Sequence, residues 1–167
     1  MFNLETKLIS KEIEMNAQEI IAEIQSYEPL MPVNVLEQAL IGPMKALSET
    51  VEHVLPSFSA GADGPMLAGF FLITKNFLSE SRVHLTEINY DISKRNTICN
   101  IRYKKSQLNV MGENNIIKKT YTIHEYEMVH THAMLRTQIS FVDKDSLAPK
   151  WKSLVEQVFP ANSLVGE

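Results

Sequence analysis

The chain has 167 residues, a net charge of -4 and 44% hydrophobic residues, which is the size and polarity of a single folded domain. The acidic balance argues against a general nucleic-acid binder, and no apolar run approaches the roughly 18 residues that a membrane-spanning helix needs. The single cysteine, Cys99, cannot form an internal disulfide, so the sequence predicts a cytoplasmic protein in a reducing compartment.

Charge is distributed unevenly along the chain. Residues 1–66 carry ten acidic and three basic residues, whereas residues 67–167 carry ten acidic and thirteen basic residues. The basic excess is concentrated in the segment SKRNTICNIRYKK and at Lys118 and Lys119. Such a cluster is typical of a docking face for an acidic partner or a phosphate group, and equally of the solvated face of a hairpin.

The first predicted element is a helix that ends near Tyr27. Apolar residues recur at the spacing of one helical face, at Ile13, Ala17, Ile20, Ile21, Ile24 and Tyr27. Asn16 followed by Glu19 is a start signal, because each of these side chains can satisfy a free backbone N–H of the first turn. The segment YEPLMP ends the helix, since proline cannot continue a helix interior.

A second helix is predicted from Val33 to about Pro56. Two sets of apolar residues share helical faces in this segment, and Pro43 between them predicts a kink. Glu37 would lie near the start of this helix. The following segment SFSAGADGP is predicted to be a loop because it is rich in glycine and small polar residues.

Beyond residue 66 the apolar period changes from helical to alternating, which indicates β-structure. The predicted strands are, in chain order, MLAGFFLITKNFL, RVHLTEINYDI, NTICNIRYKK, NIIKKTYTI and MVHTHAMLRTQISFV. The second and third strands flank SKRN and are predicted to form a hairpin, with Cys99 on the apolar side of its strand. The segment MGENN is predicted to be a turn, with Gly112 available for a positive φ.

A last helix is predicted from about Ser146 until Pro160, with Trp151 anchoring it on the sheet. Helices, then consecutive antiparallel strands, then a helix indicate an α+β protein with one antiparallel sheet of about five strands. We expect a single domain over residues 1–167. Its parts would be a helical segment over 1–28, a helix and sheet over 29–142, and a C-terminal helix and tail over 143–167.

Three of the five histidines lie in IHEYEMVHTH, residues 123–132. In the predicted strand His130 and His132 point to the same side, opposite the apolar side that carries Val129, Ile139 and Phe141. Two such imidazoles could hold a metal with a neighbouring carboxylate, or one could be catalytic. A His-x-His pair is also common on a solvated or partner-facing strand, so no metal site is assigned.

One order of parts resembles a known fold. PLMPVNVLEQALIGPMKALSE is followed by the strands described above and by the MGENN turn, over about residues 29–123. This order is similar to the hot-dog fold of hydroxyacyl-thioester dehydratases and thioesterases, in which a proline-led segment feeds a long helix that an antiparallel sheet wraps. The resemblance implies a role in lipid metabolism, a homodimer and an acyl chain carried on coenzyme A or acyl carrier protein.

The resemblance also implies site residues. A carboxylate on the long helix often works with a histidine from a preceding loop, and Glu37 lies near the matching place. The family's loop histidine has no counterpart, because the first histidine in the chain is His53. Whether the protein is an enzyme is therefore left open. A phosphate or acidic carrier would suit the basic residues Lys94, Arg95, Arg102, Lys104 and Lys105, and no cofactor is implied.

The alternative is a non-catalytic module that binds a ligand or a protein. Helices followed by a curved antiparallel sheet and a tryptophan-bearing final helix also suit cone-shaped ligand-binding folds. From about residue 66 onward, a pleckstrin-homology-like barrel fits as well. On this interpretation the strand faces and the final helix bind a protein or a lipid headgroup. The path of the second helix distinguishes the two: enclosed by the sheet it favours the hot-dog fold, and outside the sheet it favours the module.

Overall fold

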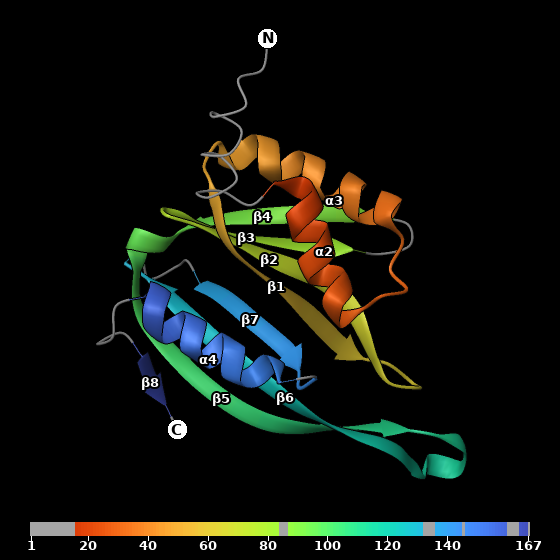
Figure 1. Ribbon diagram of the computed structural model, residues 1–167. Coiled ribbons are helices and arrows are strands. Elements are labelled where there is room, and N and C mark those ends of the chain that lie inside the picture. The colour runs from red at the N-terminus through yellow and green to blue at the C-terminus, as the bar shows by residue number, and fades with distance from the viewer. Residues whose placement is uncertain (1–15, 84–86, 132–135, 145, 160–163, 167) are drawn as a thin grey trace. The chain divides into compact units, whose positions relative to one another are not determined.

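The protein is α+β, as predicted, with two four-stranded sheets in place of one sheet of about five strands (Figure 1). The structure is a computed structural model and describes residues 16–83, 87–131, 136–144, 146–159 and 164–166. Within these ranges, no helix is both long enough and apolar enough to cross a membrane. The chain forms two compact units. One comprises Gly69–Lys94 and the described part of Met1–Pro56, and the other comprises Ser57–Ala68 and the described part of Arg95–Glu167.

Helix α2, Ala17–Tyr27, begins where the sequence predicted. The Asn16 side chain accepts a hydrogen bond from the backbone N–H of Glu19 at 2.9 Å, which satisfies one of the free donors of the first turn. The buried face consists of Ile20, Ile21, Ile24 and Tyr27. The predicted Asn16 cap and the apolar face from Ile20 to Tyr27 are therefore confirmed, whereas Ile13, with which the predicted face began, lies outside the described residues.

Helix α3, Val33–Leu47, is shorter than predicted. It continues through Pro43 and ends at Leu47, and the capping residue Ser48 has a φ of 51°, in the left-handed region. After two further residues strand β1, Val51–Ala60, begins, and it includes the start of the predicted loop. Five consecutive residues, 54–58, are buried in β1. A strand buried on both faces shows no alternation, so its apolar residues resembled a helical face.

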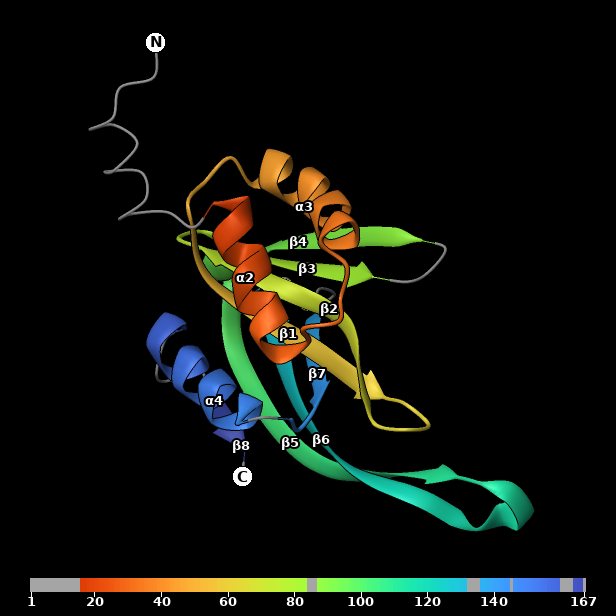
Figure 2. The ribbon, with the colours of Figure 1, turned by 45° about the vertical axis from the view of Figure 1, so that its right-hand side comes forward.

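The first sheet has the strand order β1-β2-β3-β4, so its strands follow one another along the chain. Strand β2 is Pro65–Thr74, β3 is Phe77–Val83 and β4 is Ile88–Lys94. The single strand predicted after residue 66 is therefore two strands. Two views place α2 and α3 on the same face of this sheet, and α3 packs against β3 and β4 (Figures 1 and 2).

The second sheet has the strand order β7-β6-β5-β8. Strands β5, Ile98–Met111, and β6, Ile117–His130, are antiparallel along their whole length. The predicted hairpin around SKRN is wrong, because β4 pairs with β3 and β5 pairs with β6. A 3-10 turn at Arg95–Thr97 joins β4 to β5. SKRN therefore consists of the last two residues of β4 and the first two of this turn, rather than a hairpin loop.

The turn between β5 and β6 is where MGENN predicted it. Its positive φ angles are at Asn114 and Asn115, 61° and 58°, rather than at Gly112. Asparagine tolerates this region because its short polar side chain bonds locally. The long strand predicted for residues 128–142 is wrong: β6 ends at His130 and β7 is Arg136–Val142. Residues 132–135, including His132, lie outside the described residues.

Two predictions about strand faces are also corrected. In β6 the buried residues include Met128 and His130, whereas Val129 is only partly buried. In β5 Cys99 is exposed, because a bulge between Ile98 and Asn100 interrupts the alternation. The buried faces of β7 were predicted correctly, with Ile139 and Phe141 in the core.

Helix α4, Leu147–Val158, covers the buried face of the second sheet. Its buried residues are Leu147, Trp151, Leu154 and Val155. The Trp151 ring stacks on Phe141 with 5.5 Å between centroids and lies 6.5 Å from Tyr126. The predicted helix and its tryptophan anchor are confirmed.

Candidate functional site

Strand β5 forms a partly open edge of the second sheet. The short strand β8, Leu164–Gly166, pairs with it in parallel, opposite Ile101–Tyr103 only. From Lys104 to Met111, no described strand pairs with this side of β5. We call this stretch the β5 edge. It presents backbone N–H and C=O groups that an added strand can pair with.

Beyond β7 and β8, strands β5 and β6 continue as a two-stranded ribbon (Figure 1). We call the ribbon the arm and define it as residues 107–122. Four of its large apolar side chains are well exposed: Leu108 at 46%, Met111 at 51%, Ile116 at 65% and Ile117 at 52%. Clustered exposed apolar side chains are typical of interaction surfaces.

Three cations of this region lie on β5 itself. Strand β5 carries Arg102, Lys104 and Lys105 and no acidic residue. The nearest carboxylates are one strand further in, on β6, where Glu127 lies opposite Arg102 and Glu125 lies opposite Lys104. A segment added at the β5 edge would therefore meet Lys104 and Lys105 before the carboxylates of β6, whereas the position beside Arg102 is taken by β8.

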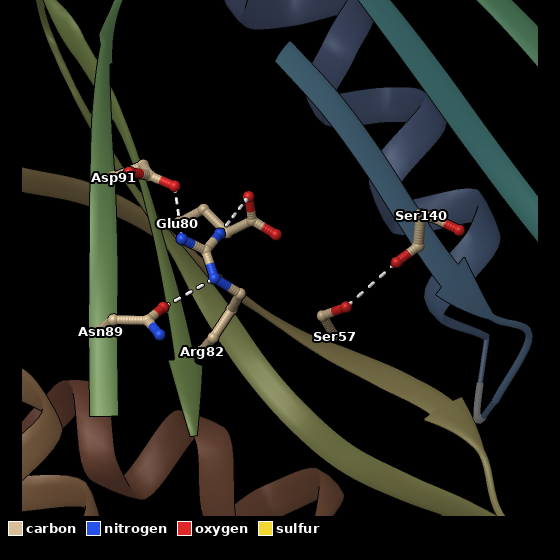
Figure 3. Close-up of polar contacts among 6 residues, drawn as sticks. All are labelled: Ser57, Glu80, Arg82, Asn89, Asp91 and Ser140. Carbon is tan, nitrogen blue, oxygen red and sulfur yellow. Dashed lines mark hydrogen bonds and ion pairs between the residues drawn. The ribbon is translucent and has the colours of Figure 1, made fainter. Parts of the chain in front are cut away.

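The other side of the arm is supported by the turn between β1 and β2, which belongs to the same compact unit. The Tyr121 hydroxyl donates to the carbonyl of Gly61 at 2.5 Å, and the Lys118 ammonium lies 3.1 Å from the Asp63 carboxylate. The Ser57 hydroxyl donates to the carbonyl of Ser140 in β7 at 3.1 Å (Figure 3). These contacts hold the β6 side and leave the β5 edge accessible.

The basic residues predicted from the sequence do not form one group. Lys94 ends β4 in one compact unit, whereas the other four lie in the second unit. Arg95 donates to the carbonyl of Val158 at 2.6 Å, and its guanidinium lies 5.7 Å from the centre of the Phe159 ring. Arg95 therefore fixes the end of α4. Arg102, Lys104 and Lys105 are exposed on β5, and phosphate binding by them stays a prediction.

Glu37 lies on the exposed face of α3, with Gln38 and Ile41. The opposite face of the helix is buried and includes Leu36 and Leu40. The structure thus places the carboxylate toward solvent, and its catalytic role stays a prediction.

The two described histidines of β6 are both buried and hydrogen-bonded. His130 bonds through Nδ1 to the Thr97 hydroxyl at 2.6 Å and through Nε2 to the Thr137 hydroxyl at 2.8 Å. Burial lowers the pKa of His130. His124 bonds through Nδ1 to the Tyr103 hydroxyl at 2.7 Å, and its Nε2 lies 3.5 Å from the Asp143 carboxylate. The described residues contain no cluster of three side chains suited to a metal.

A polar cluster on β3 and β4 is centred on Arg82 (Figure 3). Its guanidinium bonds to Asn89 at 2.7 Å, to Glu80 at 3.1 Å and to Asp91. Glu80 and Asp91 are directly opposite each other across the two strands. Burial is the main cause that raises the pKa of Glu80, and Arg82 partly opposes it. Because all three guanidinium nitrogens are engaged, the cluster is a structural cross-link rather than an anion site.

Comparison with known proteins identifies no family. No protein-family model matches the chain, and no curated protein matches it. A solved structure, the C-terminal domain of an unknown protein from Leishmania infantum, is similar with a TM-score of 0.39 and 12% identity, over 74% of this chain and 94% of that one. That degree of similarity assigns neither fold nor function.

The β5 edge is the part of the molecule best arranged to bind something, and the sequence did not predict it. The sequence did contain a signal, because apolar and basic residues lie on both sides of MGENN and the strand pattern continues beyond the bounds of the two predicted strands, NTICNIRYKK and NIIKKTYTI. Recognising the edge required the pairing partners of β5, which a single sequence does not contain.

Proposed function

We propose that the chain is a non-catalytic interaction module that binds an extended polypeptide segment at the β5 edge. The observation that carries the proposal is the position of β8, which adds to the same side of β5 as a parallel strand. That side therefore accepts an extended segment with ordinary strand pairing. Partners bound in this way gain affinity from backbone hydrogen bonds and specificity from alternate side chains.

The order of elements supports a module of the pleckstrin-homology-like kind. Four strands pair in chain order in one sheet, three more pair in chain order in the other, and helix α4 follows. Helix α3 packs through one face and leaves the opposite face exposed. Such one-sided packing favours the module over a helix enclosed by the sheet.

The test is selection of binding peptides from a random displayed library on the full-length chain. Hydrogen exchange is then measured with and without a selected peptide. We expect slower exchange of the backbone amides of residues 104–111, because an added strand pairs with them. Strand β4, the open edge of the first sheet, is the internal control and should not change. Protection confined to other segments, or no selected peptide at all, would contradict the proposal.

Acyl-thioester chemistry is the second candidate, and one observation favours it: α3 lies across an antiparallel sheet. On this proposal Glu37 acts as a general base toward a water that attacks the thioester. Hydrolysis of a panel of acyl thioesters is measured for the wild type and for Glu37→Gln. The proposal expects turnover that the substitution abolishes. A wild type without turnover on any substrate would eliminate it.

A further inference from the structure

We propose that the segment bound at the β5 edge is acidic beside Lys104 and Lys105 and apolar toward Met111. This inference rests on the proposed function, since it names the chemistry of the partner at that same edge. It is argued from the order of side chains along β5, which runs from cations near the body of the sheet to apolar residues at the end of the arm.

Distance favours carboxylates at the first end. An added strand lies about 4.8 Å from β5 and about twice as far from β6. It therefore meets Lys104 and Lys105 at close range, whereas Glu125 on β6 is a strand spacing further away. Lys105 lies opposite His124 rather than opposite an acid. Screening at physiological salt has a length of about 8 Å, so the nearer charges dominate.

The apolar end follows from the alternation of side chains. Lys104, Leu108 and Val110 share one face of β5, because they are separated by even numbers of residues. Lys105 and Met111 share the other face. Each face thus changes from a cation to an apolar residue in the same direction. A complementary strand has acidic residues at one end on both faces and apolar residues at the other.

A polypeptide fits the arm better than a lipid bilayer does. Residues 104–111 of β5 and 117–122 of β6 pair with the opposite strand of the hairpin, and the described residues show no further strand on their outer sides. Unpaired strand edges are costly in hydrocarbon, because the backbone groups find no hydrogen-bond partner there. Lysines on an edge strand also discourage pairing with basic or purely apolar chains. An acidic strand is the partner that these lysines favour.

The test uses seven-residue peptides with two aspartates at one end and alternating valine and threonine at the other. Both directions are made, because the added strand can be parallel or antiparallel. We expect one of them to bind the full-length chain. The variant Lys104→Glu/Lys105→Glu should bind this aspartate peptide about tenfold more weakly than the wild type does. The same variant should bind a second peptide, in which lysines replace the aspartates. A reciprocal gain of this kind cannot result from loss of folding.

Two control variants separate the edge from the rest of the surface. Lys45→Glu/Lys75→Glu reverses the same charge at two exposed lysines outside the second sheet and should change the affinity much less. Leu108→Ser/Met111→Ser should weaken binding by removing apolar contacts. Its matched control is Ile41→Ser on α3, where the side chain is 65% exposed. Circular dichroism of all variants checks that they remain folded.

The outcomes distinguish the inference from the function on which it rests. If library peptides protect residues 104–111 but carry no acidic end, or if the charge reversal has no effect, the inference is wrong and the proposed function stands. If no peptide protects this edge, both are wrong. A membrane surface would be the partner instead if the protein sedimented with vesicles of phosphatidylcholine and phosphatidylglycerol and this depended on Leu108 and Met111. That result would also overturn the inference.

Discussion

Arg82 separates two carboxylates that the strand register brings together. Replacing Arg82 with methionine leaves Glu80 and Asp91 opposite each other without a cation. We expect the free energy of unfolding to fall by about 1 kcal/mol, because like charges on directly opposite positions repel. Urea denaturation measures the change. Adding Glu80→Gln to the variant should restore part of the loss. A double variant no more stable than the single one would show that repulsion is not the cause.

His130 makes the stability depend on pH. Burial lowers its pKa in the folded protein below the ordinary value of 6.5. As pH falls through 6.5, the unfolded chain binds a proton that the folded protein does not, so the unfolded state is favoured. The contribution of neutral His130 to the free energy of unfolding is therefore fully present above pH 6.5 and is lost progressively below it.

The measurement is urea denaturation of the wild type and of His130→Gln at several pH values. Glutamine retains a donor and an acceptor for the hydroxyls of Thr97 and Thr137. The stability advantage of the wild type over the variant should shrink toward zero or change sign as pH falls below 6.5, because only the wild type loses this contribution. Parallel curves from pH 8 to pH 5 would rule out a role for this histidine.

At the scale of elements, the close pairing of β2 with β3 depends on Gly69. A Cβ built on Gly69 lies 1.9 Å from the carbonyl oxygen of Ser81, which is backbone and cannot turn aside. Gly69→Ala should therefore lower the free energy of unfolding by about 2 kcal/mol or more, through a shift of the strands. Thermal unfolding measures it. Gly112→Ala is the control, because the contact there is with the Lys118 side chain at 3.2 Å. Equal effects would contradict this account.

The elements that the sequence predicted well are those whose pattern is local. Helix α2 has its cap and apolar face in consecutive residues, and α4 has Trp151 within a clear helical spacing. Strand β1 was missed because burial on both faces removes the alternation that identifies a strand. The false hairpin at SKRN and the unrecognised β5 edge have one cause. Both depend on which strands pair, and pairing is decided by contacts between distant residues.

At the scale of the whole molecule, neither compact unit is a continuous piece of chain. The chain passes between them after Pro56, after Ala68 and after Lys94, so strands β1 and β2 each contribute to both units. Contacts inside the second unit, such as Tyr121 to Gly61 and Ser140 to Ser57, join segments more than 50 residues apart. The second unit therefore needs residues 57–68 together with chain beyond Lys94, and the first unit needs chain on both sides of residues 57–68.

We accordingly expect the two units to unfold together, as the predicted single domain would. Trp151 fluorescence reports the second unit, and hydrogen exchange of the β3 amides in urea reports the first. The two transitions should coincide at one urea concentration, because losing either unit removes the strands β1 and β2 that the other shares. A fragment that ends at Lys94 should be unfolded, since its residues 57–68 lack their partners. Two separate transitions, or a folded fragment, would contradict this expectation, because each unit would then keep its part of β1 and β2 folded in the absence of the other unit.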